Sequence, residues 1–229
     1  PLLMRKVLHR VVYPELVRGG VLVDVPHLRS VGSRYRGDHE LAGLLAQEAG
    51  YVLLGVLAEG RAAGWTPLQL QDQGDRRAHE HLAARLAELR PDDAVLSEEG
   101  SDDRARLGSD RVWIIDPLDG TSDFARPGSV EWAVHVALVE DGVPTAAAVS
   151  LPPSGGLYGT GVSVVDRTSN RDRPIIVTSR SQWGEAEEVA EAIGGVVRSC
   201  GSAGVKAMAV VAGSADVYVH PSGLYEWDA

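Results

Sequence analysis

The chain has 229 residues, of which 44% are hydrophobic, and its formal net charge at pH 7 is -10. A chain of this length can bury a sizeable core as one domain or as two packed subdomains, and the acidic charge argues against a nucleic-acid polymer as the main partner. No apolar run reaches the roughly 18 residues of a membrane span, and Cys200, the single cysteine, excludes an intrachain disulfide and a cysteine metal cluster. We therefore expect a reducing, cytoplasmic location and no membrane partner.

Residues 1–37 differ from the rest of the chain, because seven lysines and arginines stand against only Glu15 and Asp24. The stretch has neither the continuous apolar core nor the small-residue cleavage signal of a targeting peptide. We interpret it as an N-terminal extension of unknown role.

Two helices are expected to follow. The first begins with Asp38 as its N-cap and ends at Gly60 and Gly64. The second runs from Asp75, which would stabilise the positive end of the helix, to a point before Pro91. Apolar residues at helical spacing predict the buried faces: Leu41, Leu44, Leu45, Ala49, Val52, Val56 and Leu57 in the first, and Ala78, Leu82, Leu86 and Leu89 in the second.

The next two elements are short strands that end in acidic residues. Residues 95–96 precede Ser-Glu-Glu-Gly, and adjacent glutamates after a strand are usually solvated. Residues 112–115 form an apolar run of the kind that a buried strand uses, and Asp116-Pro117 is expected to end it. Asp119 follows in a forced turn, Gly120 allows a close backbone approach, and Thr121 opens a helix. One interpretation of this segment is a polar turn with two solvated aspartates. The other is a binding site, because two carboxylates before the start of a helix can bind a hard cation next to a phosphate.

The remaining chain predicts strands at 132–140 and 143–151, joined by a hairpin turn at Asp141-Gly142, and another at 157–159. His135 lies in an apolar strand, where a core or network role is more common than metal binding. Residues 166–173 are polar and indicate a loop. Strands at 175–178, 196–198 and 216–220 then alternate with helices at 185–193 and after Gly201-Ser202.

The hexapeptide Asp116-Pro117-Leu118-Asp119-Gly120-Thr121 resembles the signature of the inositol monophosphatase superfamily of Mg-dependent, lithium-sensitive phosphatases. The resemblance covers roughly residues 38–229. Its other marks occur in family order: Asp75, Glu98-Glu99, Gly201-Ser202 and Trp227-Asp228. Asp72 departs from the pattern, because the family has a threonine three residues before its aspartate.

The resemblance implies a layered α/β sandwich with two subdomains. Residues 38–150 would form the first and contain most metal ligands, and residues 151–229 would form a second that is incomplete at its end. It also implies two or three Mg²⁺ ions, held by Glu98, Asp116, Asp119, Asp228 and the carbonyl of Leu118. In the family, the counterparts of Asp75 and Thr121 orient and deprotonate the attacking water, and the N–H groups of Gly120 and Thr121 bind the phosphate.

The expected substrate is a small phosphorylated molecule. Gly201-Ser202 and Lys206 resemble a segment of the 3′(2′),5′-bisphosphate nucleotidase branch that lies beside the sugar and phosphate. This branch converts adenosine 3′,5′-bisphosphate, a product of sulfate assimilation, to AMP and phosphate. Pro221 stands where inositol phosphatases often carry an acid, which favours the nucleotide. The alternatives are inositol monophosphatase or fructose-1,6-bisphosphatase activity, and a non-catalytic metal-binding or regulatory protein. A homodimer is a further expectation.

Overall fold

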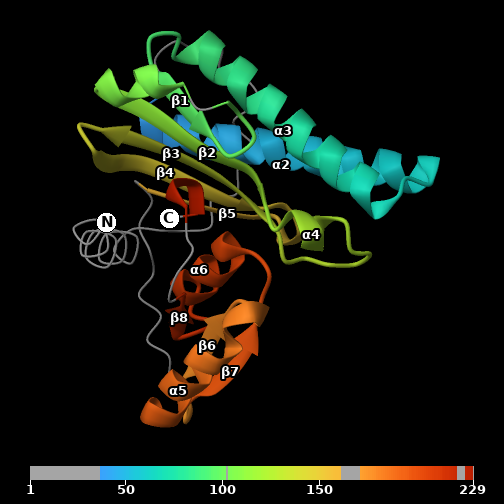
Figure 1. Cartoon of the computed structure of the whole chain (residues 1–229), viewed down its shortest axis with the longest axis vertical. Helices are drawn as coiled ribbons and strands as arrows, with labels where there is room; N and C mark the ends of the chain where they lie inside the picture. The colour runs from blue at the N-terminus through green and yellow to red at the C-terminus, as the bar shows by residue number, and fades with distance from the viewer. Residues whose placement is uncertain (1–36, 102, 161–170, 221–224, 229) are drawn as a thin grey trace.

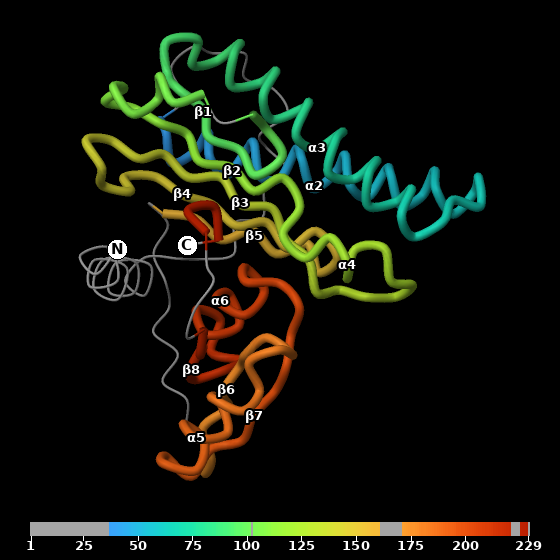
Figure 2. The backbone as a smooth tube through the Cα atoms, in the orientation of Figure 1, coloured from blue at the N-terminus to red at the C-terminus, as the bar shows by residue number. Residues whose placement is uncertain are grey.

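The computed structural model describes residues 37–101, 103–160, 171–220 and 225–228. The described part starts with two long helices, α2 (Asp38–Ala63) and α3 (Pro67–Leu89), and then forms two separate sheets (Figures 1 and 2). The first sheet has the strand order β1-β2-β3-β4-β5, and the second has the order β7-β6-β8. This mixed architecture confirms the expected α/β fold.

In the first sheet, β1 and β2 are parallel and the remaining neighbours are antiparallel. Its strands are β1 (Ala94–Ser97), β2 (Arg111–Asp119), β3 (Ala133–Glu140), β4 (Val143–Leu151) and β5 (Gly156–Gly159). The hairpin between β3 and β4 turns at Asp141 and Gly142, both of which have a positive φ. Because β5 pairs with β4, this sheet extends past residue 150, where the first subdomain was expected to end.

Helices α2 and α3 cover one face of the first sheet, with α2 against β3 and β4 and α3 against β2 (Figure 1). The buried residues of both helices join Trp113, Trp132 and Phe124 in one core. By length and composition, α2 could also cross a membrane, although it contains no uninterrupted apolar run of about 18 residues. Its packing on the sheet identifies it as the core helix of this layer.

Helix α3 begins earlier than the sequence analysis predicted. Thr66 is its N-cap and accepts a hydrogen bond from the Gln69 N–H, while the Gln69 side chain accepts from the Thr66 N–H, and Pro67 is the first helical residue. This capping box starts the helix before Asp75. The prediction that Asp75 opens the helix is therefore wrong, and Asp72 also lies within the helix.

Strand β2 continues to Asp119, so the prediction that it ends at Asp116-Pro117 is wrong. Asp116 pairs with His135 and Asp119 with Ala133, and the register shifts between them. The extra residue on β2 makes a bulge, which is a position where a strand tolerates proline. The bulge bends the strand end that carries both aspartates.

The second sheet is parallel and consists of β6 (Ile175–Thr178), β7 (Val196–Ser199) and β8 (Val217–Val219). Helix α5 (Trp183–Ile193) packs on β6 and β7, and α6 (Ala203–Val211) contacts β8 and also β3 and β4 of the first sheet. Figure 1 shows α6 between the two sheets, on the face of the first sheet that α2 and α3 leave open. Most of the predicted loop at 166–173 and Pro221 lie outside the described residues.

Candidate active site

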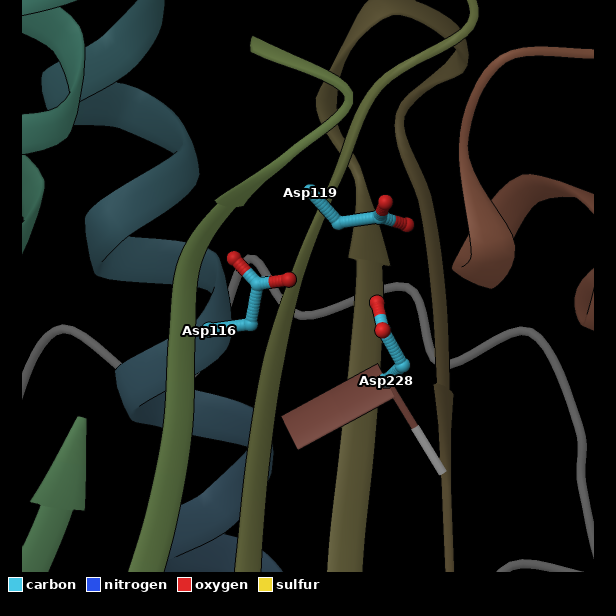
Figure 3. A group of neighbouring side chains, drawn as sticks. All are labelled: Asp116, Asp119 and Asp228. Carbon is cyan, nitrogen blue, oxygen red and sulfur yellow. The ribbon is translucent and has the colours of Figure 1, made fainter. Parts of the chain in front are cut away.

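Three aspartates meet at the bulged end of β2 (Figure 3). Asp116 and Asp119 come from β2, and Asp228 comes from the short 3-10 helix Glu226–Asp228, called η5. One carboxylate oxygen from each lies within 4.8 Å of the others. The structure thus brings together three of the four expected carboxylate ligands from distant parts of the sequence.

The other two expected ligands lie beside this cluster. Glu98 follows β1 and its carboxyl group is a hydrogen-bond partner of Asp116. The backbone N–H of Leu118 donates to Asp116 Oδ1 at 3.0 Å, and its carbonyl accepts from the Thr121 hydroxyl at 3.1 Å. Leu118 thus contacts Asp116 through its N–H and Thr121 through its carbonyl.

Asp119 is stabilised as an anion by the start of α6. It accepts hydrogen bonds from the Ser202 hydroxyl, from the Ala203 N–H at 3.1 Å and from the Gly204 N–H at 2.7 Å. Burial opposes its charge, but His135, Ser202 and the Gly204 N–H together lower the pKa of Asp119 below its usual value. Asp119 is thus charged at neutral pH.

His135 links the aspartate cluster to η5. Its Nδ1 donates to the Trp227 carbonyl at 2.9 Å, and its Nε2 lies 3.2 Å from Asp119 Oδ2. Nε2 lies at ion-pair distance from Asp119 but not in hydrogen-bond geometry, so its attraction to this carboxylate depends on the positive charge of the imidazolium form. Although burial opposes this charge, Asp119, Asp116 and the Trp227 carbonyl raise the pKa of His135 to about 9. His135 therefore acts in a polar network, as expected.

The remaining carboxyl groups of the cluster are held close together, and the positive charge of His135 offsets only part of their repulsion. Burial raises the pKa of Asp116 well above its usual value, and Asp119 and Glu98 raise it further. Burial also raises the pKa values of Glu98 and Asp228, and neighbouring carboxylates add to this effect. A site with four carboxylates and a backbone carbonyl has the oxygen donors that a hard divalent cation prefers, and the cation would offset the repulsion. The residues therefore fit a metal ion.

Asp75 and Thr121 form a pair next to the cluster. The Thr121 hydroxyl lies 3.4 Å from Asp75 Oδ1 and 3.1 Å from the Leu118 carbonyl, so its single proton is shared between two acceptors. Burial and the Glu99 charge raise the pKa of Asp75 to about 7. Asp75 reaches Thr121 from the middle of α3, one layer away from β2.

Gly120 forms the turn between β2 and the one-turn helix α4 (Thr121–Phe124). Its φ is 88°, and an added Cβ would lie 2.7 Å from the Glu131 carbonyl oxygen. Only glycine fits this conformation and this space. Binding of a phosphate by the N–H groups of Gly120 and Thr121 stays a prediction.

The expected substrate contacts of Gly201, Ser202 and Lys206 are occupied by protein groups. The Gly201 N–H donates to Glu131 Oε2 at 3.0 Å, and the Ser202 hydroxyl donates to Asp119. Lys206 is 1% exposed, and its ammonium group donates to the carbonyls of Cys200 and Gly201 at 3.1 and 3.4 Å. The lysine thus holds the turn before α6, and its expected contact with a phosphate stays a prediction.

Sequence reasoning missed a second polar network beside the site. Arg180 binds both Asp123 and Glu131, and Glu131 also accepts from Gly201. Asp123 is buried and lies two residues after Thr121. Its closeness to the motif in the sequence could have indicated a role beside the site. Arg180 has no such signal, because only the pairing of distant segments brings it to Asp123.

The comparisons with known proteins agree with this geometry. A sequence model of the Inositol monophosphatase family matches residues 40–229. The chain belongs to the inositol monophosphatase family. Its relatives depend on metal ions, in line with the acidic cluster.

Two relatives from this family share more than two fifths of their aligned residues with the chain. A Mycobacterium bovis protein named 3′-phosphoadenosine 5′-phosphate phosphatase is 45% identical over 192 residues, 80% of this chain and 71% of the relative. A Mycobacterium leprae protein of the same name is 42% identical over 214 residues, 84% of this chain and 75% of the relative.

Solved structures from the inositol monophosphatase family have the same fold. CysQ from Bacteroides thetaiotaomicron superposes with a TM-score of 0.68 at 28% identity, over 86% of this chain and 84% of that protein. Family membership and the phosphatase relatives make the chain a phosphoric monoester hydrolase.

Proposed function

We propose that the chain hydrolyses the 3′-phosphate of adenosine 3′,5′-bisphosphate to give AMP and phosphate, with Mg²⁺ as its cofactor. The observation that carries this proposal is the 45% identity to a relative named 3′-phosphoadenosine 5′-phosphate phosphatase. The carboxylate cluster supports it, because Asp116, Asp119 and Asp228 converge as oxygen ligands for a hard cation.

Mg²⁺ would be held by Glu98, Asp116, Asp119, Asp228 and the Leu118 carbonyl. When bound, it would acidify a coordinated water and polarise the phosphoryl oxygens. The chain's own residues orient the reaction. The Ser202 hydroxyl and the α6 N–H groups keep Asp119 in place, and the Leu118 N–H fixes one oxygen of Asp116.

Asp75 and Thr121 are proposed to handle the proton of the attacking water. When the Thr121 hydroxyl donates to Asp75, a lone pair on Oγ1 can accept a hydrogen bond from the water. As the water gives its proton to Oγ1, the Thr121 proton would pass to Asp75, which is the base. A base works best when its pKa lies near the working pH. The pKa of Asp75 is about 7, raised by burial and by Glu99, which meets that condition in the metal-free protein.

The proposed location is the cytoplasm, where a phosphatase of this specificity would remove a product of sulfate assimilation. The free thiol of Cys200, which is buried, supports a reducing compartment. Inhibition by Li⁺ is a further part of the proposal and rests on the family resemblance.

The test is a phosphate-release assay with adenosine 3′,5′-bisphosphate, inositol 1-phosphate and fructose 1,6-bisphosphate, each with Mg²⁺ and with a chelator. We expect the nucleotide to have the highest kcat/KM and the chelator to abolish turnover. A higher kcat/KM for inositol 1-phosphate would refute the substrate while leaving the metal chemistry intact. Full activity after exhaustive chelation would refute the metal dependence, and no turnover of any phosphate would favour a non-catalytic role.

A further inference from the structure

Arg180 connects the segment after β6 to the first sheet. It is the first residue of the 3-10 helix Arg180–Gln182. Its guanidinium group donates to Asp123 Oδ2 at 3.1 Å and Oδ1 at 3.2 Å, and to Glu131 Oε2 at 2.6 Å. Asp123 belongs to α4, directly after the metal-site motif, and Glu131 precedes β3. One arginine that follows β6 of the second sheet thus binds two carboxylates from the segment between β2 and β3 of the first.

Asp123 depends on partners because it is 2% exposed. A buried carboxylate without a compensating charge is costly, and a planar guanidinium that binds both of its oxygens is an effective partner. Arg126 also lies 2.8 Å from Asp123 Oδ1, but it comes from the same local turn. Arg180 supplies the partner that spans the two sheets.

Gly201 rests directly on these carboxylates. Its N–H donates to Glu131 Oε2 at 3.0 Å, and a Cβ at this position would lie 1.8 Å from Asp123 Oδ2. The next residue, Ser202, is the N-cap of α6 and donates to Asp119. Contacts therefore run without a gap from Arg180 through Glu131 and Gly201 to Ser202 and a proposed metal ligand.

We propose that Arg180, Asp123 and Glu131 form a positioning bridge that fixes the Gly201–Ser202 turn beside the carboxylate cluster. The bridge would fix the distance between the turn and the phosphate at the metal site. The turn could then hold the leaving nucleoside monophosphate in the orientation that the reaction needs. This inference rests on the proposed function. A direct phosphate contact by Arg180 is disfavoured, because the two carboxylates offset the charges of Arg180 and Arg126 and leave no net positive charge.

The test compares Arg180→Ala, Glu131→Gln and the double variant in the Mg²⁺-loaded protein. Each is assayed with adenosine 3′,5′-bisphosphate and with p-nitrophenyl phosphate, whose small leaving group would not need the turn. We expect each single variant to raise the nucleotide KM about tenfold, and the double variant to be no worse than the poorer single one, because residues that act as a unit are not additive. For p-nitrophenyl phosphate, kcat/KM is expected to stay within about threefold.

Arg173→Ala is the matched control. Arg173 is also exposed, and it donates to the carbonyls of Gly194 and Gly195 at the other end of α5. Its loss removes an arginine close to β6 without touching the bridge, so both substrates should react as in the wild type. If Arg180→Ala does not fold, Arg180→Lys gives the answer, since lysine cannot bind two carboxylates as a fork, and a partial rise in nucleotide KM is expected.

Three outcomes would overturn the bridge. A severe loss in Arg180→Ala with a harmless Glu131→Gln would mean that Arg180 binds the substrate itself. Equal losses on both substrates would indicate a merely structural role, and nucleotide KM values within about twofold of the wild type in every variant would leave the bridge without a positioning role. If the wild type prefers another phosphate, the proposed function fails, and the bridge is tested with that substrate against p-nitrophenyl phosphate.

Discussion

The charge of Asp116 is only partly compensated by the fold. Asp116 is 1% exposed, and burial, Asp119 and Glu98 all raise its pKa. We expect Asp116→Asn to lower kcat by at least about a hundredfold, a loss of about 2.7 kcal/mol of barrier stabilisation, because the amide removes a charged metal ligand. Steady-state assays with the nucleotide measure this effect. The metal-free variant should unfold at the same temperature as the wild type or higher, since the change removes charge and not core volume.

Asp141→Asn is the control for this substitution. Asp141 is exposed at the hairpin turn and has a φ of 49°, a conformation that asparagine tolerates. The same chemical change there should leave kcat unaltered. Activity of Asp116→Asn within about tenfold of the wild type would contradict the metal assignment.

Asp75 makes the stability of the metal-free protein depend on pH. Burial and Glu99 raise the pKa of Asp75 to about 7, whereas an unfolded aspartic acid titrates near about 3.9. Between these values the folded state binds more protons, so stability falls as the pH rises through this window. The melting temperature of metal-free wild type should therefore drop more than that of Asp75→Asn between about pH 5.5 and about pH 8. Parallel curves for the two proteins would contradict the raised pKa.

At the scale of elements, α6 lies against β3 with almost no space between them. A Cβ on Gly204 would lie 2.2 Å from His135 Nε2 and 3.0 Å from the Ala133 Cβ. We expect Gly204→Ala to lower the free energy of unfolding by about 1–3 kcal/mol, because the helix must move away from Asp119 or displace His135. Denaturant unfolding measures the loss, and kcat should fall as well.

Gly184→Ala is the matched helical control. Gly184 lies in α5, and a Cβ there would meet no atom within 4 Å. Alanine should stabilise this helix by about 0.5–1 kcal/mol. A similar gain in Gly204→Ala would show that α6 does not approach β3 as closely as described.

The elements differ in how far their sequence predicts them. The start of α3 was readable, since Thr66-Pro67-Leu68-Gln69 has the capping-box spacing and a proline at the first helical position. The bulge in β2 was not, because a strand's register depends on the partner strand and not on local sequence. Pro117 by itself indicated the end of the strand. The strand continues past this proline because Asp119 pairs with Ala133 on β3.

For the whole molecule, a metal ion would join parts of the chain that lie far apart in sequence. The proposed ligands come from the end of β1, from β2 and from η5. Mg²⁺ should therefore stabilise the folded wild type and raise its melting temperature. At a Mg²⁺ concentration one hundred times the dissociation constant, the gain in free energy of unfolding should be about 2.7 kcal/mol. Scanning calorimetry with and without Mg²⁺ measures this. Asp116→Asn should show little of the effect, and an equal gain in that variant would place the ion elsewhere.

The sequence predicted those site residues that belong to short family motifs. Asp116, Asp119 and Asp228 meet as the family marks predicted. The assignment of Ser202 and Lys206 to the substrate omitted their protein partners, since Asp119 and the Cys200 carbonyl become neighbours only when the second sheet packs on the first. The Arg180 bridge has the same origin in long-range packing.

The enclosure of Lys206 makes its amine a reporter of motion in the turn before α6. The sequence has only one other lysine, Lys6, which lies outside the described residues. Burial lowers the pKa of Lys206 while the turn is closed, but a lysine that reaches solvent regains its ordinary pKa of about 10.4, so labelling is best followed at alkaline pH. The rate at which an amine-directed reagent labels Lys206 therefore measures how often Cys200 and Gly201 release it. A ligand that orders this turn should slow the labelling, whether or not it is ever hydrolysed.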